Sequence, residues 1–287
     1  MLGTLLMRLI FYVLPSAIFL LFDSAAPTLS ASVKQYNELA LPARKGGFRG
    51  RPTWWKVAGF STLNVLLGLA LQFSIEFLFT KILRMSSVIR ISMALPMPWR
   101  VVRDIGLGLC LREIIQYYAH RFILHPSRVS RYTAANEPWL QLSKWHQSWQ
   151  HSVSVPYSFS ANYDHPAAWA IWRWLPVFLP AVFFRFHLLT WYIYIALVSL
   201  DEAFTYSGYT GLPSFFIWRS IARMQGKHLI SGGAGNYAPI GIMDWIHDTT
   251  VGEDIVDRAK SELMAGQNNR TVRSRSRSKN RNRAGRH

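Results

Sequence analysis

Long apolar stretches, separated by shorter polar and basic segments, dominate the pattern along the chain. Residues 57–80 run for 24 positions with Glu76 as their only charge, and about 20 mostly apolar residues suffice to cross a bilayer as a helix. Residues 188–209 form a second such run, interrupted only by the acidic pair Asp201 and Glu202. The pattern predicts an all-α fold, a multi-pass membrane helical bundle.

The first 22 residues form another apolar run, which Arg8 and Pro15 interrupt. A retained transmembrane helix is one interpretation of this run. A cleaved signal peptide is the other, because small residues follow it. The sequence leaves both open.

Two further segments are expected to complete the bundle. Residues 104–119 would return toward the cytosol, and residues 167–184 would form a kinked hairpin with the run that begins at residue 188. The segment between them, residues 126–166, is polar enough to form a cytosolic loop.

Basic residues set the expected orientation. Residues 33–56 contain six Lys or Arg and one acid, and the positive-inside rule places such a loop in the cytosol. The same face would then carry residues 120–166 and everything after residue 210. Basic residues between 81 and 103 oppose this orientation, so we expect residues 86–99 to lie along the membrane surface.

The net charge of +17 is concentrated toward the C-terminus. Residues 270–287 contain eight Lys or Arg and no acid. Such a segment cannot bury apolar surface, and we expect residues 257–287 to be a disordered tail that binds anionic lipid headgroups. Nucleic acid is not an expected partner of a multi-pass membrane chain.

A group of histidines falls on the expected cytosolic face. It comprises two pairs with a spacing of five and two single positions: His120, His125, His146, His151, His165 and His228. Neutral imidazole is a common ligand of redox metals, and nitrogen and oxygen donors suit iron. The single cysteine, Cys110, excludes a thiolate metal cluster. A metal site is the functional hypothesis, and ordinary interfacial histidines are the alternative.

The spacing of five requires a local departure from the α-helix. On a helix of 3.6 residues per turn it rotates the second residue by about 140° from the first. His120 and His125 therefore share a face only if the helix ends or loosens near Leu124, which Pro126 favours. The second pair carries the same condition.

Aromatic and isolated histidine positions have plainer interpretations. Six tryptophans between residues 139 and 174 predict a belt at the membrane interface. His187 is expected at a helix end on the far side of the membrane, and His247 at the surface.

Four motifs, in their order and with their flanking residues, resemble the fatty acid hydroxylase and sterol desaturase superfamily of membrane di-iron oxygenases. They are HRFILH at 120–125, KWHQSWQHSVSVPYSFSANYDHP at 144–166, HLLTWYIYIALVSLDEAFTYSGY at 187–209 and KHLISGGAGNYAPIGIMDWIHDTTVG at 227–252. The resemblance covers about residues 118–252. It implies a hydroxylase-like domain over residues 104–256, preceded by a transmembrane region with a basic cytosolic loop over residues 1–103.

The resemblance also implies a biochemical role. It implies an endoplasmic reticulum oxidoreductase that uses O2 and non-haem iron, as a di-iron centre, to hydroxylate or desaturate a sterol or fatty acyl chain. An electron donor such as cytochrome b5 would be a partner. The six histidines named above would be the metal ligands, and the carboxylates that support them would be Asp164, Glu202 and Asp244.

The chain departs from the superfamily pattern at several histidine positions. The second motif normally ends in adjacent histidines, but Trp149 and Gln150 precede a lone His151 here, and the last motif offers only His228. Tyr206 stands where a histidine is expected. Two functions therefore stay open: a lipid hydroxylase or desaturase, or a metal-depleted, non-catalytic membrane scaffold that binds lipid or a partner.

Overall fold

The computed structural model describes residues 1–42, 51–126, 138–210 and 216–252, and residues 1–251 form one compact unit. The described chain is a bundle of helices, with two isolated β-bridges and no sheet. The all-α prediction is therefore confirmed. The predicted disordered tail, residues 257–287, lies outside the described residues.

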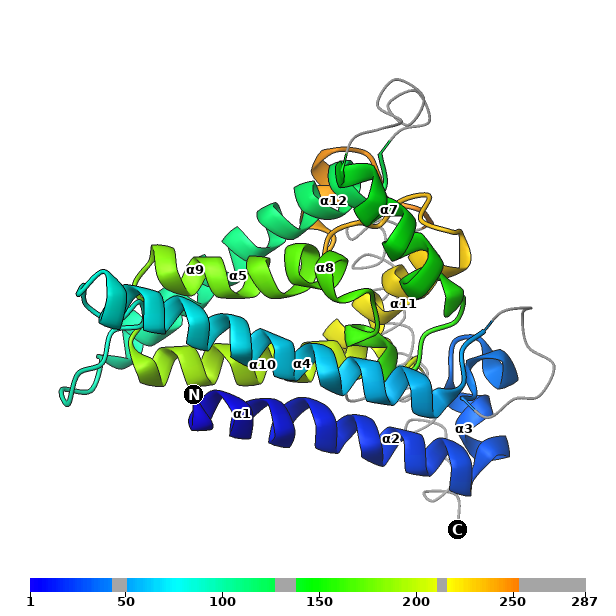
Figure 1. Ribbon diagram of the computed structural model, residues 1–287. Helices are drawn as coiled ribbons and strands as arrows, with labels where there is room; N and C mark the ends of the chain where they lie inside the picture. The colour runs from blue at the N-terminus through cyan, green and yellow to red at the C-terminus, as the bar shows by residue number, and fades with distance from the viewer. Residues whose placement is uncertain (43–50, 127–137, 211–215, 253–287) are drawn as a thin grey trace, which may run out of the picture. The chain divides into compact units, whose positions relative to one another are not determined.

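Three helices in the described part of the chain are long and apolar enough to cross a membrane. They are α1 (Leu2–Arg8) continued through a π-helical turn into α2 (Leu14–Ala25), α4 (Trp54–Phe77) continued to Ile82, and α10 (Leu188–Tyr206). The first span packs along α10, and α4 contacts it at α1. Figure 1 shows α4 running opposite to the other two. These helices confirm the membrane-bundle class.

The first of these spans contains a proline without being interrupted. A π-helical turn over Leu9–Val13 precedes Pro15, which lies in the first turn of α2. The wider turn and the position near a helix start both accommodate a residue that has no backbone N–H. The apolar run at the N-terminus is therefore one continuous helix from Leu2 to Ala25.

Helix α5 (Pro98–Tyr118) begins earlier than the predicted residue 104. Pro98 occupies its first turn, where the fixed backbone φ of proline suits a helix start. The helix continues as a π-helical turn over Ala119–Leu124. Five charged residues lie along α5, and it is not among the three apolar spans; its crossing of the membrane stays a prediction.

The predicted segment 167–184 is also helical throughout. It comprises α8 (Pro166–Trp169), a π-helical turn over Ala170–Trp174, and α9 (Leu175–Phe183). Helix α9 packs against α5 in the upper layer of the bundle in Figure 1.

The segment 126–166, expected to be a loop, contains a helix, α7 (Pro138–Trp149). Leu140, Ser143 and His146 are buried, and their spacing of three places them on one helical face. The face is hard to see in the sequence because only one of the three side chains is apolar.

The segments expected on the cytosolic face meet at one end of the bundle. The backbone N–H of Gln35 donates to the carbonyl of Gly208 at 2.9 Å, and Arg51 donates to the carbonyl of Val155 at 3.3 Å. The short helices α3 (Pro27–Val33) and α12 (Ile242–Ile246) and the longer α11 (Phe216–Ile230) complete this end.

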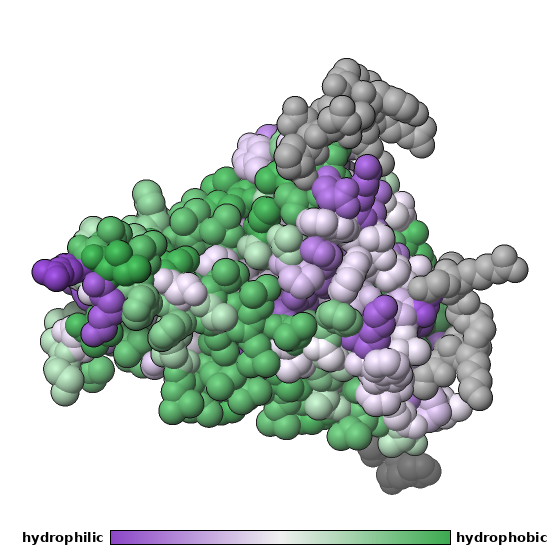
Figure 2. Space-filling model, viewed as in Figure 1, coloured by the Kyte–Doolittle hydropathy of each residue, from purple (hydrophilic) through white to green (hydrophobic). Residues whose placement is uncertain are grey.

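The opposite end holds the loop between α4 and α5. The backbone N–H of Arg90 donates to the carbonyl of Phe186 at 2.9 Å, which joins this loop to the turn before α10. Met93 is fully exposed and Leu95 is 79% exposed; the placement of residues 86–99 along the membrane surface stays a prediction. Figure 2 shows an extensive apolar surface over the helices, with polar residues gathered toward the two ends.

Two of the six tryptophans expected at the interface lie inside the bundle instead. Trp169 and Trp172 are each 1% exposed. Trp169 donates its Nε1 hydrogen to Asn162 at 2.8 Å, and Trp172 donates to Asp164 at 2.7 Å. A buried indole needs such an acceptor, so these two residues belong to the polar interior and not to a membrane belt.

Candidate metal centre

The π-helical turn at the end of α5 brings the first histidine pair to one face. The backbone N–H of His125 donates to the carbonyl of His120 at 3.0 Å, a bond that spans five residues. A turn closed by this bond places residues i and i+5 nearly in line. The two ring centroids lie 4.9 Å apart, so the condition that the sequence spacing imposed is met.

A change of helix type also serves the second pair. His146 lies on the buried face of α7, which ends at Trp149, and His151 follows in the 3-10 turn Gln150–Ser152. The two rings lie 5.1 Å apart.

The remaining histidine of the site, His228, lies near the end of α11. The glycine-rich loop that follows passes directly over the ring of His125. Gly233 has a φ of +90°, and a Cβ atom there would lie 2.3 Å from Cε1 of His125. Only glycine meets both conditions, so this loop shapes the site.

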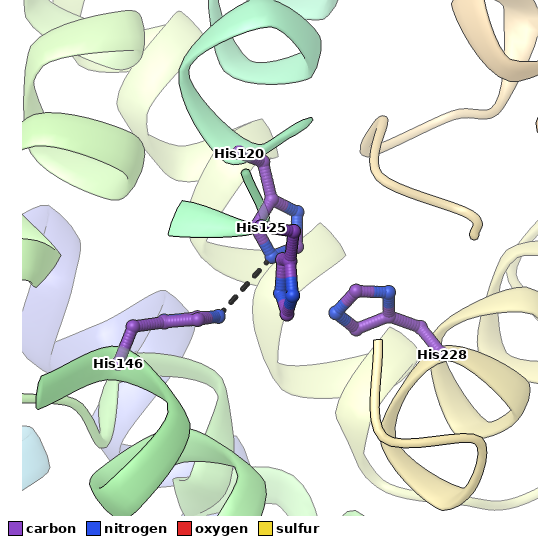
Figure 3. A group of neighbouring side chains, drawn as sticks. All are labelled: His120, His125, His146 and His228. Carbon is purple, nitrogen blue, oxygen red and sulfur yellow. Dashed lines mark hydrogen bonds between the residues drawn. The ribbon is translucent and has the colours of Figure 1, made fainter. Parts of the chain in front are cut away.

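Five imidazole rings meet at this end of the bundle. We call them the histidine cluster: His120, His125, His146, His151 and His228. Four of them, drawn in Figure 3, offer ligand nitrogens that all lie within 4.8 Å of one another. Segments far apart in the sequence therefore present their imidazoles to one small volume.

Backbone carbonyls fix the orientation of two of these rings. Nδ1 of His120 donates to the carbonyl of Tyr237 at 2.8 Å, and Nδ1 of His228 donates to the carbonyl of Gly235 at 2.6 Å. A neutral imidazole has a single N–H. Nε2 of each ring therefore carries a lone pair and faces the centre of the cluster.

A carboxylate does the same for His146. Its Nδ1 donates to Asp164 at 2.6 Å, and Asp164 also accepts the indole N–H of Trp172. Trp172 in turn stacks on His120, with centroids 4.5 Å apart. A carboxylate that holds the far nitrogen of a histidine is the usual support of a metal ligand.

The converging nitrogens lack protons to share. Nε2 of His120 and Nε2 of His146 lie 3.3 Å apart, and both bear lone pairs, so this contact is not a hydrogen bond between neutral rings. Nε2 of His228 is buried and has no hydrogen-bond partner, which is costly for a buried polar atom. A bound metal cation would satisfy all three nitrogens, and the donor set therefore fits a metal ion.

Burial keeps four of the five rings in the state that a metal requires. It lowers the pKa of His228 to about 3. Burial, together with the neighbouring imidazoles, also lowers the pKa of His120, His125 and His151 well below the usual value. Neutral imidazoles are the form that binds metals, so no proton has to leave these rings at pH 7.

Comparison with known proteins agrees with this geometry. The sequence model of the family described as fatty acid hydroxylase matches residues 105–249, about half of the chain. The chain belongs to the fatty acid hydroxylase family. The resemblance found in the sequence motifs is thus confirmed, and with its three apolar helices this family member is an integral membrane protein. No solved structure matches the chain.

One predicted ligand, His165, lies outside the histidine cluster of this family member. Its ring stacks on Trp145 with centroids 4.0 Å apart, and its Nδ1 accepts the N–H of Ala167 as the cap of α8. The lone pair of Nδ1 is therefore occupied by the helix cap, and Trp145 covers one face of the ring. Five of the six predicted ligands therefore come together, and the sixth serves the helix start.

Glu202, predicted to support a ligand, instead belongs to an interhelical ion-pair network. It accepts from Arg8 at 2.6 Å and from Asn162 at 2.8 Å. Nearby, Arg112 pairs with Asp201 at 3.1 Å. We call Arg8, Arg112, Asp201 and Glu202 the ion-pair network; it joins the first span to α5 and α10.

Asp244 acts on the cluster through the backbone. It accepts the N–H groups of Tyr237 and Ala238 at 2.9 and 2.7 Å and the hydroxyl of Thr249 at 2.7 Å. These bonds fix the loop whose Tyr237 carbonyl holds His120. Asp244 is thus a positioning residue two steps from the cluster.

Sequence reasoning missed a further positioning carboxylate, Glu113. It is buried on α5 and accepts four backbone N–H groups from Ile240 to Met243, at 2.7–3.2 Å. It thereby fastens the start of α12 to α5. No local signal singles out Glu113 in the sequence, because α5 carries four other charged residues.

Proposed function

We propose that this family member is a membrane lipid oxygenase that hydroxylates or desaturates a sterol or fatty acyl chain, using histidine-bound non-haem iron and O2. The observation that carries the proposal is the convergence of unprotonated imidazole nitrogens in a buried volume. Iron held there would supply the redox chemistry needed to activate O2. The family membership of residues 105–249 supports the same reaction class.

The residues of the chain have defined tasks in this proposal. His120, His146 and His228 hold the metal with Nε2, because their Nδ1 hydrogens are fixed by the Tyr237 and Gly235 carbonyls and a carboxylate. Trp172 covers one side of the cluster and keeps water from that side. Exclusion of water strengthens the electrostatic contacts within a site.

Mass spectrometry of lipid products tests the proposal. The full chain would be reconstituted in lipid nanodiscs with Fe(II), O2 and a reduced cytochrome b5 system. We expect a lipid that gains one oxygen or loses two hydrogens, and no such product from His120→Ala. His187→Asn is the control, because His187 caps α10 at the opposite end of the bundle; absence of product from the correctly folded, iron-loaded chain contradicts the proposal.

The location of the reaction belongs to the same proposal. The end of the bundle that carries the cluster also carries the basic residue Arg51, which supports a cytosolic orientation. We propose the endoplasmic reticulum membrane as the compartment and a cytochrome b5-type protein as the electron donor. Glycosylation acceptor sites inserted after Met93 and after Gly232 test the orientation, and only the first is expected to be glycosylated.

A non-catalytic scaffold is the second candidate function, and one observation favours it. Tyr206 stands where the family pattern has a histidine, and its hydroxyl donates to Gln225 at 3.2 Å and accepts from Arg173. A folded chain that binds lipid but neither holds metal nor forms product would establish this second function.

A further inference from the structure

The five rings of the histidine cluster have a definite arrangement. His125 contacts all four others, with centroids 4.9–5.1 Å apart. The other four contact one another in a closed order, at 4.6–5.1 Å: His120, His146, His151, His228 and back to His120. This is a square pyramid of imidazoles with His125 at its apex.

The size of this pyramid fits one ion. Metal–imidazole bonds of about 2.0–2.1 Å place neighbouring nitrogens of a square-pyramidal sphere roughly 2.8–3.0 Å apart and opposite nitrogens roughly 4.0–4.2 Å apart. Nε2 of His120 lies 3.3 Å from Nε2 of His146, and Nε2 of His151 lies 3.2 Å from Nε2 of His125. Both distances are within about 0.5 Å of an edge of this sphere. The nitrogens of His120, His125, His146 and His228 all lie within 4.8 Å of one another, so small movements of the rings would bring them onto one ion.

The chain offers little to hold a second ion. Paired metals lie about 3.5–4 Å apart and share further donors. Within the described residues, a single group of histidine, cysteine and carboxylate side chains could hold a metal. The nearest carboxylate, Asp164, already accepts from His146, Trp172 and the N–H of His165.

A permanent cation lies beside the cluster. Arg173 is buried, sits 4.1 Å over the ring of Trp172, and donates to Tyr206. Trp172 in turn stacks on His120 with centroids 4.5 Å apart. A guanidinium keeps its charge at all accessible pH values. The buried carboxylate of Glu202 offsets part of this charge. The remainder would repel a second dication in this poorly screened interior.

We propose that the histidine cluster binds a single divalent metal ion through five imidazoles, with His125 at the apex, and that Arg173 supplies the positive charge that a second ion would otherwise bring. This inference rests on the proposed function only for the presence of a metal. It replaces the di-iron centre that the sequence resemblance implies with a mononuclear one.

Metal stoichiometry tests the inference. The full chain, purified in detergent without oxygen, would be titrated with Fe(II), freed of loose iron and analysed by mass spectrometry for iron per chain. We expect one iron per chain and, after addition of nitric oxide, the paramagnetic signal of an isolated iron–nitrosyl. Two irons per chain with magnetic coupling overturn the single-ion inference but leave the proposed function intact. No bound iron overturns both.

Two histidine variants test the ligand set by the same titration. His151→Ala removes one corner of the pyramid, and we expect at least a tenfold loss of iron affinity. His165→Ala is the matched control, since His165 was an equally good ligand by sequence but stacks on Trp145; its affinity should stay within twofold. The reverse outcome overturns the pyramid.

Charge variants test the role of Arg173. Arg173→Gln removes the cation and should raise iron affinity several-fold, whereas Arg173→Lys should leave it within twofold. Circular dichroism and gel filtration establish that both variants are folded, and if Arg173→Gln is not, Arg173→Met is used in its place. Unchanged affinity in a folded, uncharged variant overturns this part of the inference.

Discussion

The histidine cluster and the ion-pair network are both buried and polar, but they are satisfied in opposite ways. In the network each cation faces a carboxylate, as Arg8 faces Glu202 at 2.6 Å and Arg112 faces Asp201 at 3.1 Å. In the cluster, lone pairs face lone pairs, and the buried Nε2 of His228 has no partner within the described residues.

The difference distinguishes buried polar groups that stabilise the fold from buried polar groups that bind a ligand. Paired charges between helices fix how the first span sits on α10, and the loss of one partner leaves an uncompensated charge. The unprotonated nitrogens of the histidine cluster are held in place by the fold, and only a bound ligand such as a metal ion would satisfy them. The cluster should therefore govern metal binding, and the network should govern stability.

Removal of a cluster histidine should have the largest effect on function. We expect His120→Ala to lose iron affinity by more than the ~10–100-fold typical of outer partners of a metal site, and to lose lipid oxidation. Its metal-free form should lose about 1–3 kcal/mol of unfolding free energy, because the buried carbonyl of Tyr237 loses its donor. This loss is smaller than that expected for a buried charge left without its partner. Iron titration and detergent unfolding measure the two effects. Persistent iron binding would remove His120 from the site.

Removal of a carboxylate from the ion-pair network should have the opposite effect, with a large loss of stability and little loss of iron binding. Glu202→Gln leaves Arg8 without its charge partner and should lower the free energy of unfolding by about 3–5 kcal/mol. Asp104→Asn is the control, because its partner Arg103 is 56% exposed at the side chain and exposed pairs contribute about 0–1 kcal/mol. Equal losses in the two variants would contradict the distinction between network and surface pairs. The folded fraction of Glu202→Gln should still bind iron.

Loss of the carboxylate behind a ligand should give a smaller effect on metal binding. Asp164→Asn keeps the volume of the side chain but removes the negative charge of the carboxylate that accepts hydrogen bonds from His146 and Trp172. We expect iron affinity to fall by about 10–100-fold, with the chain still folded. Wild-type affinity would show that the carboxylate does not position the ring.

A pair of adjacent glycines offers the finest test. Gly233→Ala places a Cβ 2.3 Å from the ring of His125, while Gly232→Ala meets nothing within 4 Å, although both residues have positive φ. The two variants share the backbone penalty of about 1 kcal/mol or more. Only Gly233→Ala should displace His125, with roughly a tenfold loss of iron affinity. Equal losses would show that backbone strain alone is responsible.

The sequence could predict the bundle because its evidence is local. An apolar run such as residues 57–80 is long enough to identify a span without any partner, and the structure extends it to Trp54–Ile82. Five cluster histidines could be proposed because they are recognisable in short motifs. The π-helical turn that aligns His120 with His125 was anticipated only as a loosening near Leu124, since the choice of turn depends on what the rings contact.

What the sequence could not show depends on contacts between distant segments. His165 and His151 look equivalent in the motif, and only the ring of Trp145 beside His165 separates them. Likewise, the sequence allows Glu202 to support a metal ligand, because it cannot show that the partner of Glu202 is Arg8, 194 positions away. The sequence predicts Trp172 in a membrane belt, because the hydrogen bond from its indole to Asp164 becomes visible only in the folded chain.

X-ray absorption at the iron edge of the Fe(II)-loaded full chain tests the central claim most directly, because it reports which atoms surround the metal. The account predicts nitrogen neighbours with the outer-atom scattering of imidazole rings from the five cluster histidines, and its loss in His120→Ala. Iron surrounded only by oxygen, with the same spectrum in wild type and variant, would contradict it.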